Sequence, residues 1–276
     1  MSGELKGQVA IVTGGGRGFG RAISQRFAAE GATVTVTSRT TTQIEETVRL
    51  IEEQGGQALA VTGDVASRKD VARVVAATEE RFGKVTLLVN NAGVPDPFGP
   101  IGVIDPDRWW AAQEVHIRAP FLYISAVLPS MLQQGTGRII NISAIGGKVV
   151  APYLSAYCVG KAAQNRLTEL LAAETRDLGI SVFAIDPGFV ITALAEQTIN
   201  SPDAQRWLPD MVKRLQGRRQ EANAGADLAR CQQRCVDLAS GRYDLLSGRY
   251  MVLDDDLDDL VLQLETDDIT IIPSDH

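Results

Sequence analysis

Tyr157 and Lys161 are the residues of this sequence whose types and spacing most directly suggest chemistry. Side chains four residues apart lie on the same face of a helix. A phenol has an unperturbed pKa of about 10, so it exchanges a proton near pH 7 only where a nearby cation favours the phenolate. The lysine ammonium can supply that charge. Such a pair also occurs as an ordinary surface contact, so the surrounding motifs must decide between the two interpretations.

A glycine-rich segment near the N-terminus, "TGGGRGFG" at residues 13–20, joins an apolar run to a helical pattern. Gly14 permits a tight turn, and Gly18 and Gly20 let the backbone approach a pyrophosphate. The helix that follows presents free N–H groups and a positive potential at its N-terminus. An ordinary glycine-rich turn has the same composition, so this motif predicts a nucleotide site only together with others.

Apolar runs and helical patterns alternate along the chain, and this alternation predicts the scaffold that positions these residues. The Val/Ile-rich runs show no polar alternation, which is typical of parallel strands buried on both faces. We therefore predict an α/β fold, a single doubly wound, Rossmann-like parallel sheet with helices on both faces and ligands at the carboxyl ends of its strands. The predicted strands are residues 8–13, 33–38, 58–64, 85–91, 137–143 and 180–186, and the predicted helices are residues 18–31, 40–54, 67–82, 105–133, 153–178 and 226–240.

Four motifs stand in order at the predicted strand ends: T-G-x-x-x-G-x-G from Thr13, "NNAG" at residues 90–93, Y-x-x-x-K from Tyr157, and "DPGFVIT" at residues 186–192. Together they resemble the short-chain dehydrogenase/reductase family, over about residues 5–250. The resemblance implies a nicotinamide dinucleotide bound by Gly14, Gly16, Arg17, Gly18, Phe19, Gly20, Asp64, Val65, Asn91, Ala92, Gly93, Tyr157, Lys161, Pro187, Gly188, Val190 and Thr192.

The end of the second predicted strand, "VTSRT", bears on the choice between the two nicotinamide cofactors. An acidic residue there would bind the ribose 2′-hydroxyl and repel a 2′-phosphate, but the chain has Ser38, Arg39 and Thr40 instead. Arg17 lies near the same ribose in proteins of the resembled family and adds a second positive charge. We therefore expect NADP(H) to be preferred over NAD(H). The alternative is that Arg39 only lies on the adenine face, as it can for either cofactor.

The catalytic set departs from the family's usual pattern at two positions. A serine normally stands thirteen residues before the tyrosine, where this chain has Ala144, and an asparagine normally stands in the long preceding helix, where it has His116. Ser143 carries a hydroxyl, but side chains alternate along a strand, so it needs a bulge or a shift to reach the substrate. The candidate catalytic residues are therefore Tyr157, Lys161, His116 and Ser143.

Three roles are open to His116 at this stage. Its ring can replace the asparagine by hydrogen-bonding backbone and water near Lys161. It can also act as an acid or a base, because the unperturbed pKa of histidine lies near neutrality. The third interpretation is a hydrogen-bonded structural residue within the helix.

Two segments break the alternation in a chain that we expect to form one domain over residues 1–276. Residues 190–224 are polar and contain two prolines, and an insertion at the strand ends predicts a substrate lid. Residues 254–276 form an acidic C-terminal extension, for which we expect a solvated surface with a short helix and a terminal strand. A seventh strand is expected just before this extension.

The composition of the chain argues against certain classes of binding partner. The net charge of −7 gives no electrostatic footprint for nucleic acid, and no Lys/Arg cluster suggests an anionic membrane surface. No apolar run reaches the length of a membrane span, so we expect a cytoplasmic protein with no membrane partner. The three cysteines, Cys158, Cys231 and Cys235, lack metal-type spacing, so we expect reduced thiols and no metal.

The leading functional hypothesis is an NADP(H)-dependent oxidoreductase that interconverts a ketone and a secondary alcohol on a moderately apolar small molecule. The pocket would be formed by the lid around residues 189–215 and the loop at residues 94–104. One alternative is an enzyme of the same fold diverted to non-redox proton transfer, such as dehydration, isomerisation or cyclisation. Another is a nucleotide-binding protein without activity. The two long helices at 105–133 and 153–178 suggest association into a homodimer or homotetramer.

Overall fold

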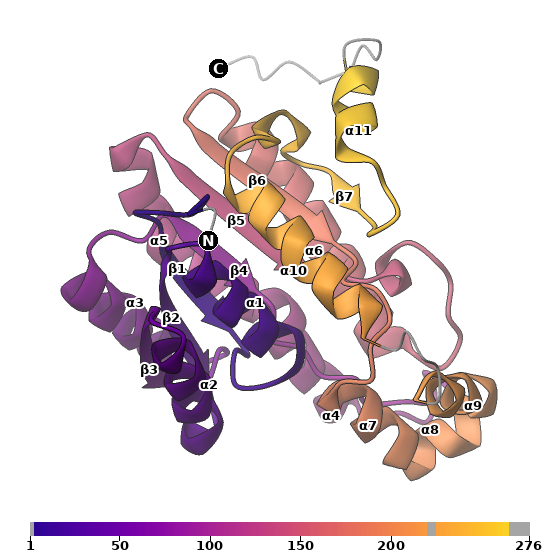
Figure 1. The fold of residues 1–276 in the computed structure, drawn as a ribbon. Coiled ribbons are helices and arrows are strands. Elements are labelled where there is room, and N and C mark those ends of the chain that lie inside the picture. The colour runs from indigo at the N-terminus through magenta and orange to yellow at the C-terminus, as the bar shows by residue number, and fades with distance from the viewer. Residues whose placement is uncertain (1–2, 220–224, 265–276) are drawn as a thin grey trace.

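The computed structural model describes residues 3–219 and 225–264 of the chain. Its centre is one sheet of seven parallel strands in the order β3-β2-β1-β4-β5-β6-β7 (Figure 1). This confirms the predicted fold class. The strands are β1 Val9–Thr13, β2 Thr33–Ser38, β3 Gln57–Thr62, β4 Leu87–Asn90, β5 Gly137–Ile142, β6 Ile180–Ile185 and β7 Tyr250–Met251.

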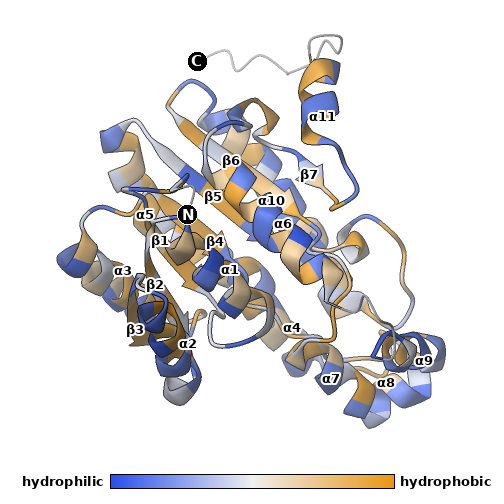
Figure 2. Ribbon diagram, in the orientation of Figure 1, coloured by the Kyte–Doolittle hydropathy of each residue, from blue (hydrophilic) through white to orange (hydrophobic). Residues whose placement is uncertain are grey.

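Helices cover both faces of the sheet, and this is why the central strands carry no polar face. One face is covered by α1 Gly18–Ala29, α2 Thr41–Glu53 and α10 Ala226–Ala239. The other face is covered by α3 Arg68–Phe82, α5 Ala119–Gln134 and α6 Ser155–Glu174. In Figure 2 the strands are mostly hydrophobic, whereas the helices show hydrophilic outer positions.

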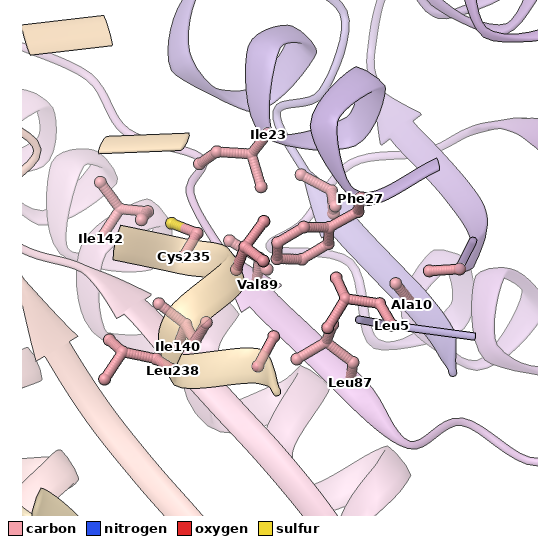
Figure 3. Packing of buried hydrophobic residues seen from close by; sticks show 14 of the residues in the cluster. Leu5, Ala10, Ile23, Phe27, Leu87, Val89, Ile140, Ile142, Cys235 and Leu238 are labelled. Carbon is pink, nitrogen blue, oxygen red and sulfur yellow. The ribbon is translucent and has the colours of Figure 1, made fainter. Parts of the chain in front are cut away.

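The core under α1 and α10 packs against one face of the sheet. Ile23 and Phe27 of α1 point toward Val89 of β4, and Cys235 and Leu238 of α10 close the cluster from the side (Figure 3). All five side chains are fully buried. This packing fixes the start of α1, and with it the glycine turn, against the carboxyl end of β1.

The long helix expected at residues 105–133 forms, but it is not regular. It runs as α4 Pro106–Gln113, a π-helical turn at Glu114–Arg118, and α5. Of the described residues, only the run Pro106–Gln134 is long and apolar enough by composition to cross a membrane, with a mean hydropathy of 1.3. In this fold Tyr123, Val127 and Met131 on that run are buried against the sheet.

The strand order reverses between β1 and β4, and the carboxyl ends of the strands open there into a cavity. The described part of residues 190–224 forms three short helices, α7 Ala193–Asn200, α8 Pro202–Trp207 and α9 Pro209–Arg218. They lie together at this end of the sheet, whereas α11 Leu257–Leu264 lies at the opposite end (Figure 1). The seventh strand and the short acidic helix expected in the tail are present, and the expected terminal strand falls outside the described residues.

Candidate active site

A cavity of about 1110 Å³ at the carboxyl ends of the strands brings the predicted site residues together. Every residue predicted to bind the cofactor lines it except Gly20. The residues that line it are Gly14, Gly16, Arg17, Gly18, Phe19, Ser38, Arg39, Thr40, Asp64, Val65, Asn91, Ala92, Gly93, Tyr157, Lys161, Pro187, Gly188, Val190 and Thr192.

The glycine turn fits a closely approaching dinucleotide backbone. Gly14 and Gly18 have φ values of +64° and +54°, which disfavour any side chain with a Cβ. Gly20 lies behind the turn, where a Cβ would come within 2.5 Å of Asn91 Nδ2. Asn91 Nδ2 donates to the carbonyl oxygens of Thr13 and Gly14 at 2.8 and 3.2 Å, so it holds the turn against β4. Asn91 and Gly20 therefore shape the cradle, and Asn91 also lines it.

The end of the cavity beside β2 is positively charged. Arg17, Ser38, Arg39 and Thr40 line it, and no carboxylate follows β2. Neither arginine makes an ion pair with a residue in the described ranges, so both charges are available to a ligand. Asp64, which also lines this end, accepts the N–H of Ala66 at 3.0 Å.

Tyr157 lies in the first turn of α6 and faces the cavity from among the apolar side chains of Phe98, Leu154 and Met211. Burial raises the pKa of its phenol far above the usual value of 10, and the negative charges of Asp186 and of a Cys158 thiolate act in the same direction. The phenol is therefore protonated at neutral pH and has a proton to give.

Lys161 lies one turn further along α6 and is only 3% exposed. Its Nζ donates to the carbonyl of Ile142 at 2.6 Å and to Gln164 Oε1 at 3.1 Å, and it lies 5.7 Å from the centre of the Tyr157 ring. Burial lowers its pKa to about 7, against an opposing effect of Asp186. The structure thus places the expected cation beside the phenol, and burial brings the pKa of this amine close to neutrality.

Because the Lys161 amine is buried and has a lowered pKa, it affects how the free energy of unfolding depends on pH. The variant Lys161→Met tests this effect. An unfolded lysine has a pKa near 10.5, so between pH 7 and 10.5 the unfolded chain binds a proton that the folded chain does not. The free energy of unfolding therefore rises with pH through this window in the wild type. Denaturant unfolding at pH 7.0 and 8.5 should show a clearly smaller rise in Lys161→Met. An equal rise in the two proteins would contradict the lowered pKa.

His116 occupies the π-helical turn and is fully buried outside the cavity lining. Its Nε2 lies 2.8 Å from the carbonyl oxygen of Val94, so Nε2 carries the proton, while Nδ1 has no partner among the described residues. Burial lowers its pKa to about 3, helped by the Lys161 charge, so the ring is neutral. The ring meets Tyr157 edge to face at 5.4 Å. This geometry favours the hydrogen-bonded structural role over that of an acid or base.

The His116 side chain fits against α6 because α6 has a glycine, Gly160, at the contact. A Cβ at Gly160 would come within 2.5 Å of the His116 Cβ. The π turn and α6 therefore approach closely at this point. The glycine between Tyr157 and Lys161 was the sequence signal for this contact, but its partner could not be identified from the sequence.

The family's serine position holds Ala144, which lines the cavity and carries no donor. Its neighbour Ser143 also lines the cavity, and its buried hydroxyl donates to Asn165 Oδ1 at 2.6 Å. A catalytic role for Ser143 would require this hydroxyl to leave Asn165. Asp186 was not predicted as a site residue, yet it lines the cavity beside Ala144 and accepts the N–H of Ile145 at 2.5 Å.

The remaining wall of the cavity is mostly apolar and comes from the lid and the loop before α4. Phe98, Leu208 and Met211 line it, and Tyr153 lies against Trp207 of α8 with ring centres 5.5 Å apart. Tyr153 has a φ of +67°, which is unusual for a residue with a side chain and ends the loop just before α6. The lid and this loop thus contact each other over the cavity.

Within residues 3–219 and 225–264, no group of three His, Cys, Asp or Glu side chains is arranged to hold a metal ion. All three cysteines are free thiols. Cys231 and Cys235 are buried in the core under α10, and Cys158 is partly buried beside Tyr157. These thiols contribute to packing.

A parallel doubly wound sheet with a glycine turn and a Tyr-Lys pair in one cavity defines a nucleotide-binding fold with a proton-donating site. Residues 8–203 match the family model of the short chain dehydrogenases, and the chain belongs to this family. It is therefore an oxidoreductase that uses NAD(P).

Individual relatives support this assignment. A short chain dehydrogenase of Pseudocercospora fijiensis is 34% identical over 96% of this chain and 86% of its own. A 2-(R)-hydroxypropyl-CoM dehydrogenase of Xanthobacter autotrophicus is 36% identical over 71% of this chain and 80% of its own. Among solved structures, levodione reductase superposes with a TM-score of 0.80 at 25% identity and covers 90% of this chain and 96% of its own. A gluconate 5-dehydrogenase from Burkholderia cenocepacia, in complex with NADP and tartrate, gives 0.76 at 26% identity, over 92% and 96%.

Proposed function

We propose that this protein is an NADP(H)-dependent oxidoreductase that interconverts a ketone and a secondary alcohol on a moderately apolar small molecule. The observation that carries the proposal is that Tyr157 and Lys161 share one cavity with the glycine turn and the arginines beside β2. A proton donor, a nucleotide cradle and an apolar substrate wall are thereby placed around one space. These are the parts that carbonyl reduction needs.

In the proposed reaction, the hydride is exchanged with the cofactor, and the side chains of the protein handle the proton. When bound, the nicotinamide supplies or accepts the hydride at the carbonyl carbon. Tyr157 is the acid that gives its proton to the carbonyl oxygen, and its raised pKa keeps it protonated at neutral pH. Lys161 binds the ribose and, when protonated, stabilises the phenolate that remains. The apolar residues of the lid exclude water from this proton transfer.

The preference for NADP(H) is tested by Arg39→Ala. Arg39 and Arg17 are cavity cations without an ion-pair partner among the described residues, and a 2′-phosphate would give them one. We expect the Kd for NADPH to rise about tenfold or more in the variant, whereas the Kd for NADH changes little. Fluorescence titration of the reduced cofactors measures both.

Arg166→Ala is the matched control for this titration, because Arg166 is exposed on α6 and pairs with Glu169 away from the cavity. It should leave both dissociation constants at their wild-type values. Equal affinity of the wild type for NADPH and NADH would remove the basis of the NADP(H) assignment. Equal weakening of both cofactors in Arg39→Ala would place the arginine on the adenine instead.

The reaction itself is tested by mixing protein and NADPH with a panel of ketones that differ in apolar size, and by following the absorbance of the reduced nicotinamide. Substrate-dependent oxidation of NADPH supports the proposal. Turnover of a carbonyl compound with no net change in nicotinamide would point to diverted proton-transfer chemistry. Tight binding of nucleotide without any turnover would point to a binding protein.

We also propose that the chain forms homo-oligomers through α4, α5 and α6. These helices expose large apolar side chains on their outer surfaces: Trp110, Phe121, Val159 and Leu170. Covering such side chains with a second copy would remove them from water. The molecular mass in solution, measured by light scattering, decides between monomer, dimer and tetramer.

A further inference from the structure

Asp186 stands at the end of β6 and joins three segments of the cavity wall. Its Oδ2 accepts the N–H of Ile145 at 2.5 Å and the hydroxyl of Tyr250 at 3.3 Å, and its Oδ1 accepts the N–H of Gly188 at 2.8 Å. These partners belong to the turn after β5, to β7 and to the loop after β6. One carboxylate therefore holds these three segments together at the cavity wall.

The charge of this carboxylate is not neutralised by an ion pair. No Lys, Arg or His of residues 3–219 and 225–264 lies within 4.0 Å of it, although other cavity carboxylates such as Asp227 are paired with arginine. The charge nevertheless reaches both members of the catalytic pair. It raises the pKa of the Tyr157 phenol and opposes the lowering of the Lys161 pKa.

We propose that Asp186 is a positioning residue that biases the site toward carbonyl reduction. Its hydrogen bonds hold the wall beside Tyr157, and its charge, which no ion pair with a described residue within 4.0 Å neutralises, would favour the oxidised cofactor, which has a cationic ring, over the reduced one. The inference rests on the proposed function. In the reduction, the carbonyl carbon gains a hydride, the carbonyl oxygen gains the Tyr157 proton, and solvent returns a proton to the phenolate. If the nicotinamide binds against this wall, the negative charge of Asp186 would stabilise the ring that has lost the hydride.

The effect of Asp186 on the Tyr157 phenol can be distinguished from that of the other charged and titratable groups around it. Lys161 and Cys158 approach Tyr157 along α6, and the neutral His116 ring contacts it from the π turn. Beyond Asp186 lie Tyr250 of β7 and Lys148, whose Nζ is 5.3 Å from the centre of the Tyr250 ring. Of the groups that raise the Tyr157 pKa, Asp186 has the largest effect after burial.

Asp186→Asn removes the charge and keeps one oxygen that can accept an N–H. NADP⁺ and NADPH are each titrated into the wild type and the variant at one ionic strength. We expect the ratio of the NADPH Kd to the NADP⁺ Kd to fall roughly fivefold, the scale of one partly screened charge near the ring. Asp210→Asn is the charge-matched control, because Asp210 lines the lid side of the same cavity. It should leave the ratio unchanged.

A second readout needs no cofactor. The phenolate absorbance is followed against pH, and the same titration of a Tyr157→Phe background isolates the signal of this one tyrosine. In Asp186→Asn we expect Tyr157 to ionise at lower pH than in the wild type, and the alkaline rise of alcohol oxidation to move to lower pH with it. Where the amide variant does not fold, Asp186→Ser gives the same test, because it removes the same charge with a smaller polar side chain.

The outcomes separate this inference from the proposed function. If the wild type binds both nucleotides, and neither the affinity ratio nor the Tyr157 titration changes in the Asp186 variants, the role of Asp186 is overturned while the oxidoreductase proposal stands. A wild type that binds neither nucleotide overturns the oxidoreductase proposal. A changed ratio in Asp210→Asn of the same size as in Asp186→Asn would show a general effect of net charge and would also overturn the role of Asp186.

Discussion

Tyr157→Phe should lower kcat for NADPH-dependent ketone reduction by about 10²–10⁴ and leave the NADPH Kd close to its wild-type value. The substitution removes one oxygen and keeps the ring that packs on Phe98, Leu154 and Met211. No described residue is hydrogen-bonded to this hydroxyl, so its loss leaves no buried partner unpaired. The measurement is initial-rate kinetics at saturating NADPH, together with a binding titration.

Tyr243→Phe is the matched control for this experiment. Its hydroxyl donates to Asp258 Oδ1 at 2.9 Å near α11, away from the cavity. It should leave kcat unchanged, with at most a loss of stability of about 1 kcal/mol. A Tyr157→Phe variant that reduced ketones at the wild-type rate would remove Tyr157 as the acid, and proton delivery from solvent would then have to be considered.

The sequence was sufficient to predict the sheet and the cofactor cradle, because both depend on local patterns. Runs such as Val9–Thr13 and Ile180–Ile185 have the mostly apolar character that a strand buried on both faces requires, and every residue of both is buried. Gly14 and Gly18 adopt positive φ, a requirement that is local to the turn. Since parallel strands end at one edge, motifs that follow different strands meet there without further information.

The properties of the catalytic groups were less predictable, because they depend on burial and on partners distant in the sequence. Alternation along β5 suggested that Ser143 faces away from the substrate, but only its bond to Asn165 shows where its hydroxyl is used. The lowered pKa of Lys161 follows from its depth beneath Ile142, and no spacing rule predicts that depth. The π turn at His116 likewise depends on the space left by Gly160 of another helix.

The cavity wall at residue 144 has no side-chain hydrogen-bond donor. Ala144 lines the cavity in an extended conformation, with φ of −168° and ψ of 160°, which any residue adopts. The N–H of the next residue, Ile145, is already used by Asp186. We expect a substrate oxygen in this cavity to meet the Tyr157 phenol without a hydroxyl from residue 144.

Ala144→Ser should raise kcat for ketone reduction by about tenfold to a hundredfold. An oxyanion donor in a preorganised site is worth about 10²–10³ in rate, and a donor introduced into a wall that did not evolve with it should recover part of this. Initial-rate kinetics at saturating NADPH measure the gain, which should vanish in the double variant with Tyr157→Phe because both groups act on the same oxygen. Ala144→Gly alters the same wall without adding a donor and should show no gain. A stable Ala144→Ser protein with an unchanged kcat would mean that the substrate oxygen does not lie against this wall, since the backbone at residue 144 would present the new hydroxyl to the cavity.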